Sequence, residues 1–310
     1  DVALDQELPC LTQAQPGPVA VRSQVTVIQG CDNFCAYCVV PFVRGRERSR
    51  PPQDVLEECR IKVAGGAREI NLLGQNVNSY RFGGWNFVRL LKAVAQTPGL
   101  LRLRFTTSHP KDMSPELIAC FGEVDRLCPS LHLPFQAGSD KILKLMNRGY
   151  SRADYLDLVK RLRAVRPDVA LSADCIVGFP GETEADFRQT MDLIEEVRFE
   201  GLFSFCYSDR PLTKARLLKN KVPPQAAAER LKKLQARQKE ITFESNLALE
   251  GRRVMVLVEG PAKRGRLLTG RTGGNKVVNF KGGPELVGRI EEVIIERAGT
   301  NSLQGEPVRG

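Results

Sequence analysis

The sequence lacks the features expected of membrane and secreted proteins. It has no run of about 18 apolar residues, which a membrane-spanning helix would need, and no apolar signal-like stretch near its start. It begins at Asp1 rather than Met, and it contains neither an internal repeat nor a low-complexity tract. We therefore expect a trimmed chain of cytoplasmic origin that makes no membrane contact.

Histidine is scarce, and the cysteines form no disulfide pattern. The 310 residues include two histidines and nine cysteines, an odd number. Scattered cysteines in a long chain without a secretory signal argue against a disulfide framework. Six of the nine are expected to be small hydrophobic residues of the core: Cys10, Cys59, Cys120, Cys128, Cys175 and Cys206.

The composition fits a basic globular protein of more than one domain. The chain is too long for one typical domain, and its 42% hydrophobic and 26% charged residues are ordinary values. The net charge is +10. A basic surface attracts polyanions, although a merely basic enzyme would have the same composition.

The order of apolar runs and helical patterns predicts an α/β fold. After a Pro- and Gln-rich leader (residues 1–23), six strand patterns alternate with helical ones between residues 24 and 222. Such alternation is typical of βα units around a parallel sheet. An eight-fold barrel usually takes about 250 residues, so we expect a partial TIM-like βα barrel. Its strands are predicted at residues 24–30, 69–75, 101–107, 130–136, 170–179 and 200–208.

The remaining residues predict a helix followed by a small β domain. Residues 223–249 form one long polar helical pattern, and short β-rich runs broken by Gly fill residues 250–310. This predicts a small all-β barrel of the OB-like kind. Residues 251–310 carry eleven Lys and Arg against six Glu, an excess of five, and Phe280 is their one aromatic. We expect this barrel to bind RNA by phosphate contacts rather than by base stacking.

Three cysteines are clustered directly after the first predicted strand. Cys31, Cys35 and Cys38 lie in the stretch "GCDNFCAYC", with the spacing C-x3-C-x2-C. Three thiolates can hold three irons of a cubane iron–sulfur cluster and leave the fourth iron open. A structural zinc site is the alternative, but it would usually take four ligands.

Several stretches together resemble one family. These are "GCDNFCAYCVVPFVRGRERSRP", "LLGQNVNSY", "RLRFTTSHPKDM", "HLPFQAGSDKILKLMNRGYSR" and "DCIVGFPGETEADF". They are similar to the MiaB-type methylthiotransferases of the radical S-adenosylmethionine (SAM) superfamily. The stretches "GRTGGNKVVNF" and "NSLQGEPV" resemble the TRAM domain that ends those proteins.

The resemblance implies a radical modification of tRNA. Cys31, Cys35 and Cys38 would hold a [4Fe–4S] cluster whose open iron binds SAM. One SAM would donate a methyl group to sulfur, and a second would yield the radical that abstracts hydrogen from C2 of N6-isopentenyladenosine beside the anticodon. The implied partners are tRNA and an electron donor such as a flavodoxin or ferredoxin, and we expect a monomer.

Further residues receive roles from this resemblance and from their positions at strand ends. Those assigned to catalysis are Gln75, Asn76 and Asp174. Those assigned to cofactor binding are Tyr37, Gln136, Ser139, Ile176, Gly178 and Glu182, although Glu182 can equally cap the next helix. Those assigned to RNA are Arg44, Arg46, Arg48, Arg50, Arg252, Arg266, Arg271 and Lys276.

The sequence departs from the family pattern in two places. The relatives carry an N-terminal domain with three more cysteines for an auxiliary cluster that supplies sulfur, and we expect this chain, with Cys10 alone before the core, to lack those ligands. The stretch "YSDRPLTKA" stands where relatives usually have "YSPRPGTPA". Two alternatives stay open: a non-catalytic, metal-stabilised RNA-binding module, and a related radical enzyme with a protein substrate.

Overall fold

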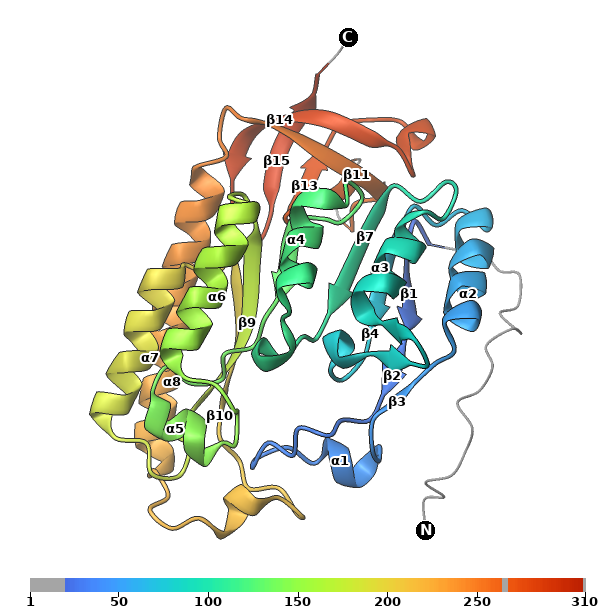
Figure 1. Ribbon diagram of the computed structural model, residues 1–310. Helices are drawn as coiled ribbons and strands as arrows, with labels where there is room; N and C mark the ends of the chain where they lie inside the picture. The colour runs from blue at the N-terminus through green and yellow to red at the C-terminus, as the bar shows by residue number, and fades with distance from the viewer. Residues whose placement is uncertain (1–19, 264–266, 309–310) are drawn as a thin grey trace.

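The computed structural model describes residues 20–263 and 267–308 (Figure 1). Most of the predicted leader, together with Cys10 and Arg266, lies outside the described residues. None of the helices in the described part is long and apolar enough to cross a bilayer.

Six parallel strands form an open barrel, as predicted. One sheet consists of β1 (Arg22–Thr26), β4 (Glu69–Leu73) and β7 (Arg102–Thr106), and the other of β8 (Ser130–His132), β9 (Ala170–Val177) and β10 (Gly201–Cys206). The two sheets meet where Leu103 and Leu127 form a parallel bridge. The strands thus follow one another in chain order, and β1 and β10 are the free edges.

Helices cover the outside of this half-barrel (Figure 1). They are α2 (Pro52–Ala64), α3 (Phe87–Ala95), α4 (Pro115–Glu123), α5 (Asp140–Leu145), α6 (Arg152–Val165) and α7 (Glu184–Val197). The last two begin at capping boxes, Ser151 with Asp154 and Thr183 with Asp186. These boxes satisfy backbone N–H groups that a helix start leaves unpaired.

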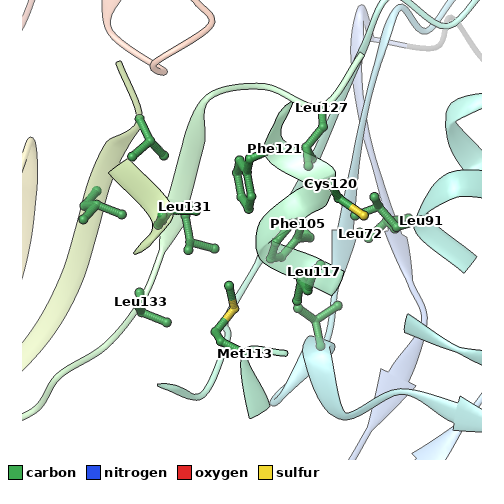
Figure 2. Close-up of a cluster of buried hydrophobic side chains, with 14 of the residues drawn as sticks. Leu72, Leu91, Phe105, Met113, Leu117, Cys120, Phe121, Leu127, Leu131 and Leu133 are labelled. Atoms are coloured by element: carbon green, nitrogen blue, oxygen red, sulfur yellow. The ribbon is translucent and has the colours of Figure 1, made fainter. Parts of the chain in front are cut away.

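The main core lies between the strands and these helices. Figure 2 shows Leu117 and Phe121 of α4 beside Phe105 of β7, while Cys120 points toward Leu72 and Leu91. The Phe105 and Phe121 ring centroids lie 5.9 Å apart. The prediction of cysteine as a core residue is confirmed at four positions, since Cys59, Cys120, Cys128 and Cys175 are buried, while Cys206 is half-buried.

Short elements that the sequence did not predict enclose the cysteine cluster. Strand β2 (Ile28–Gln29) pairs with β3 (Arg48–Ser49), and α1 (Val40–Val43) lies between them in the chain. A second hairpin joins β5 (Arg81–Phe82) to β6 (Trp85–Asn86). Two-residue strands leave no detectable alternation in a sequence.

The C-terminal residues form the predicted helix and barrel. Helix α8 (Pro224–Leu247) leads into a closed barrel of β11 (Arg253–Pro261), β12 (Leu268–Thr272), β13 (Val277–Phe280), β14 (Ile290–Ala298) and β15 (Leu303–Pro307). Strand β15 was not predicted as a strand. It is inserted between β13 and β14 and closes the barrel.

The small barrel is docked against the amino ends of the half-barrel strands. Arg102 donates to the carbonyls of Arg271 and Met255 at 2.5 and 2.8 Å, and Arg104 donates to those of Gly273 and Thr272, both at 2.9 Å. Figure 1 shows this barrel at one end of the strands and the α1 segment at the other. The cysteine cluster therefore lies at the carboxyl ends, where βα barrels carry their active sites.

Candidate functional site

The cysteine loop is fixed by hydrogen bonds from three sides. Gln75 accepts a hydrogen bond from the Gly30 N–H at 2.8 Å, Ala36 donates to the Met146 carbonyl at 2.9 Å, and the Ala36 carbonyl accepts from Ala215 at 2.8 Å. Gly30 has a φ of +76°, and a Cβ there would lie 2.1 Å from the Arg46 carbonyl oxygen. Only glycine fits at this position.

The three thiols receive hydrogen bonds suited to cluster ligands. The Val40 N–H points at Cys38 Sγ at 3.5 Å, and Arg148 Nη1 lies 3.4 Å from Cys35 Sγ. A backbone hydrogen bond from Asn33 acts on Cys31. Hydrogen bonds to the sulfurs are one of the ways in which proteins tune iron–sulfur clusters.

Arg148 is a buried cation without a carboxylate. It is 5% exposed, and none of the ion pairs formed by the described residues includes it. Its other contacts are neutral: Tyr150 Oη at 3.0 Å, Tyr37 Oη at 3.4 Å and the Pro134 carbonyl at 3.0 Å. A buried charge is costly unless it is paired. A set of thiolates around an iron–sulfur cluster provides that negative charge, so these residues fit the cluster.

The cysteine loop does not form a site for a single metal ion. Among the residues that the structure describes, no three His, Cys, Asp or Glu side chains surround a single metal-ion position. Each thiolate of a cubane site binds a different iron atom. Burial raises the pKa of Cys31 to about 11, so the metal must displace a proton when it binds.

The stretch "GFPGE" forms a tight turn next to the cysteine loop. Gly178 has a φ of +71°, and its N–H and that of Phe179 both donate to Glu182 Oε2, at 2.8 and 3.3 Å. The other Glu182 oxygen pairs with Arg230 at 2.9 Å. The Glu182 side chain thus holds the turn, while Thr183 caps α7. Ile176 is half-buried and packs with Tyr37 in the apolar cluster beneath the cysteine loop.

Gln136 and Ser139 lie at the carboxyl end of the neighbouring strand. Gln136 has a φ of +66° and bridges to Cys175 through its main chain. Ser139 is 2% exposed, and its hydroxyl donates to Asp186 Oδ1 at 2.6 Å. The Ser139 hydroxyl is therefore occupied by its hydrogen bond to α7. Gln136 differs, because a non-glycine residue with a left-handed backbone is often found at a functional site.

The three residues assigned to catalysis occupy different environments. Asn76 is 2% exposed, donates to Asp112 at 2.7 Å and accepts from the His109 N–H at 3.2 Å, so it fastens the loop after β7. Gln75 holds the cysteine loop, as described above. Asp174 differs, since its side chain is 31% exposed and faces His132 of β8.

The arginine run after the cysteines does not form one surface. Arg44 and Arg46 are exposed, and Arg46 pairs with Asp32 at 2.7 Å. Arg48 is half-buried. Arg50 is 5% exposed and donates to both Glu58 and the Thr26 carbonyl at 2.6 Å, so this residue is part of the core and cannot reach RNA.

The basic residues of the small barrel are also divided. Arg252 is exposed. Arg271 is half-buried beside Glu259, with its Nε 3.3 Å from a carboxylate oxygen. The Lys276 side chain is 15% exposed and pairs with Glu200, so it lies in the joint between the two barrels. Arg266 is outside the described residues.

Leu212 has a strained backbone. It lies in the stretch "YSDRPLTKA", which differs from the family pattern. Its φ is +69° and its side chain is 63% exposed. A left-handed backbone conformation costs free energy for leucine but not for glycine. The loop nevertheless reaches the cysteine loop through Ala215.

Sequence reasoning missed Arg148 and His132 as site residues. Arg148 sits in a turn after α5, where nothing in its neighbourhood signals a buried charge. His132 is one of only two histidines in the chain, and its position carries no motif for a metal or catalytic site. Its place three residues before "FQAG", at a strand end, was the available signal.

Comparison with protein families assigns both parts of the chain. Residues 25–194 match the radical SAM superfamily, and residues 247–308 match the TRAM domain. The half-barrel is also similar in fold to coproporphyrinogen III oxidase from Escherichia coli, described as a radical SAM enzyme. That likeness has a TM-score of 0.55 at 17% identity and covers 76% of this chain and 57% of the other.

The curated relatives are much closer. The chain is 53% identical to a tRNA-2-methylthio-N(6)-dimethylallyladenosine synthase of Geobacter metallireducens over 97% of this chain and 69% of the relative. It is 51% identical to the enzyme of that name from Syntrophus aciditrophicus over 96% of this chain and 64% of the relative. The chain thus spans about two thirds of the length of these relatives, and it belongs to the tRNA-2-methylthio-N(6)-dimethylallyladenosine synthase family of radical SAM enzymes.

Proposed function

We propose that this chain is the catalytic core of a tRNA methylthiotransferase. Its reaction would convert N6-dimethylallyladenosine beside the anticodon to the 2-methylthio derivative. The observation that carries the proposal is the 53% identity with a curated synthase across both domains. Cys31, Cys35 and Cys38, all free thiols at the carboxyl ends of the strands, support it.

The residues of the site have separable tasks. Cys31, Cys35 and Cys38 would hold a [4Fe–4S] cluster, Arg148 would balance its charge, and Gln75 keeps the loop in place through Gly30. When bound, the cluster and SAM supply a radical for C2 of adenine, a C–H bond too weakly acidic for a side-chain base. Tyr37, Gln136, Ile176 and the Gly178 turn line the region proposed for SAM, with Ser139 and Glu182 as supports.

We infer one cluster in this chain. The described residues beyond the cysteine loop carry Cys59, Cys120, Cys128 and Cys175 buried in the core, which makes them poor ligands for a second cluster. Sulfur insertion would then depend on the auxiliary cluster expected in the N-terminal part that the relatives possess.

The partners follow from the proposed reaction. The tRNA would contact the exposed Arg44, Arg46 and Arg252 together with the half-buried Arg48 and Arg271, while Arg50 and Lys276 serve the fold. A flavodoxin or ferredoxin would deliver the electron. We further propose a cytoplasmic monomer, because tRNA modification takes place where tRNA is used.

Iron and acid-labile sulfide per chain after anaerobic reconstitution test the proposal. About four of each is expected for one cubane cluster, together with SAM cleavage stimulated by a prenylated anticodon stem-loop. About eight of each would refute the single cluster. Zinc without iron would favour the non-catalytic RNA-binding module, and cleavage unaffected by RNA would favour a protein substrate.

A further inference from the structure

Six side chains from β8, β9 and β10 share the inner face of the half-barrel. Asp174 is in register with Phe203, Ile176 with Phe205, and Ser172 with His132. Register partners in neighbouring strands point to the same side of the sheet. The residues between them on β9, Leu171, Ala173 and Cys175, are buried against the helices, so this set faces the barrel interior.

His132 and Asp174 form a fixed polar pair on this face. His132 Nε2 lies 3.3 Å from Asp174 Oδ1, and His132 Nδ1 lies 3.0 Å from the Ser172 hydroxyl. The contact with the Ser172 hydroxyl orients the imidazole ring and places Nε2 beside the Asp174 carboxylate. The Asp174 side chain is 31% exposed, so its second oxygen is free to accept from a ligand.

Two phenylalanines beside this pair are largely uncovered. Phe203 and Phe205 are 61% and 56% exposed, and the Phe203 ring stands edge-on to His132, with centroids 6.0 Å apart at 74°. Both lie on β10, the free edge of the sheet. A pair of exposed aromatic side chains next to a fixed carboxylate suits a ligand that is flat and apolar and carries an N–H donor.

We propose that this face binds the N6-prenylated adenine of the substrate. In this arrangement Phe203 and Phe205 pack against the base and its dimethylallyl group. Asp174, which lies beside His132, accepts a hydrogen bond from N6–H. The inference rests on the proposed function, since the dimethylallyl group is named in the relatives' activity.

The chemistry of the base supports this assignment. Adenine ring nitrogens other than the glycosidic one are acceptors, and after prenylation N6–H is the only donor left on the edge of the base. A carboxylate accepts hydrogen bonds and cannot donate them when ionised. The Asp174 carboxylate therefore favours a base that carries N6–H, and the apolar side chains favour a base that carries the prenyl group.

Binding of three synthetic anticodon stem-loops tests the subsite. They carry N6-dimethylallyladenosine, adenosine or purine riboside at the target position, and their affinity for the full chain is measured by fluorescence anisotropy. The wild type should prefer the prenylated loop to adenosine by roughly tenfold, since one apolar group in a pocket gives that order of discrimination. It should prefer adenosine to purine riboside by roughly tenfold, the value of a hydrogen bond to a charged group.

Each variant should remove one preference only. Phe203→Ala should abolish the preference for the prenylated loop over adenosine and keep the preference for adenosine over purine riboside. Asp174→Ala should abolish the second preference and keep the first. Phe243→Ala, at an aromatic 37% exposed on α8, and Asp157→Ala, on α6, are matched controls that should keep both.

The outcomes separate the subsite from the function. Wild-type binding with both preferences intact in Phe203→Ala and Asp174→Ala would overturn the subsite and leave the proposed function standing. A wild type that binds none of the loops and shows no RNA-stimulated SAM cleavage would overturn both. Thermal melting of each variant checks that the fold is retained.

Discussion

The replacement Glu69→Gln should destabilise the half-barrel strongly while preserving its shape. Glu69 is 1% exposed, and its two oxygens lie 2.7 Å from Arg22 Nε and 3.0 Å from Arg104 Nε. The second contact is an ion pair rather than a well-aligned hydrogen bond, since neither of its atoms has a hydrogen-bond partner. The neutral amide removes the carboxylate and leaves the 5%-exposed Arg104 charge uncompensated.

The expected loss of unfolding free energy depends on which partners Arg22 and Arg104 keep in the variant. Breaking a buried ion pair by removing one partner costs about 3–5 kcal/mol. Arg104 keeps its two carbonyl acceptors, and Arg22, which is 30% exposed, keeps Glu259 at 3.5 Å. We therefore expect the lower end, about 3 kcal/mol at neutral pH. The matched control Glu57→Gln breaks an exposed pair with Arg60 and should change little.

Urea unfolding followed by the single tryptophan, Trp85, measures this loss. The arginines lower the pKa of Glu69 below its ordinary 4.5, against the effect of burial. Its stabilisation is therefore present above pH 4.5 and is lost as pH falls through the folded-state value. The difference between wild type and Glu69→Gln should shrink in acid. A loss no larger than that of Glu57→Gln, or one independent of pH, would refute the reasoning.

Three further predictions concern single positions. Leu212→Gly should raise the free energy of unfolding by about 1 kcal/mol in the same assay, because the left-handed backbone penalises leucine, whereas Leu212→Ala should not. Arg148→Met should weaken cluster retention by roughly tenfold, as loss of a residue that supports metal ligands does, measured as iron per chain against dilution and chelator. Burial lowers the pKa of His109 to about 2 from 6.5. The unfolded chain therefore takes up a proton that the folded chain does not, and stability should fall by about 2 kcal/mol between pH 6.5 and 5, a slope that His109→Gln removes.

The sequence predicted the elements that carry long, regular patterns. The six barrel strands and α8 lie within a few residues of their predicted positions, and helices α2 to α7 alternate with the strands as expected, because apolar periodicity is a local signal. The short hairpins and β15 were missed, because strands this short and rich in polar residues form only through pairing across the fold.

Side-chain roles were harder to predict because they depend on distant partners. Arg50 belongs to an alternating basic run, yet Glu58 on α2 draws it inward. Lys276 was assigned to RNA, yet Glu200 beside β10 engages it. Such pairs are set by tertiary packing, which the charge pattern alone does not encode. Asp174 was assigned to the site from the resemblance and its position at a strand end, whereas its neighbour His132 became apparent only in the structure.

The joint between the two barrels has an evolutionary consequence. Arg102 and Arg104 bind main-chain carbonyls of the TRAM domain, and every residue type offers such an oxygen. These four contacts therefore do not depend on TRAM side chains, whereas the Lys276–Glu200 pair does, and Gly273 leaves little room, since a Cβ there would approach Pro129 to 3.1 Å. Substitutions on the exposed surface of the small barrel should therefore leave these four contacts, and the orientation that they fix, in place.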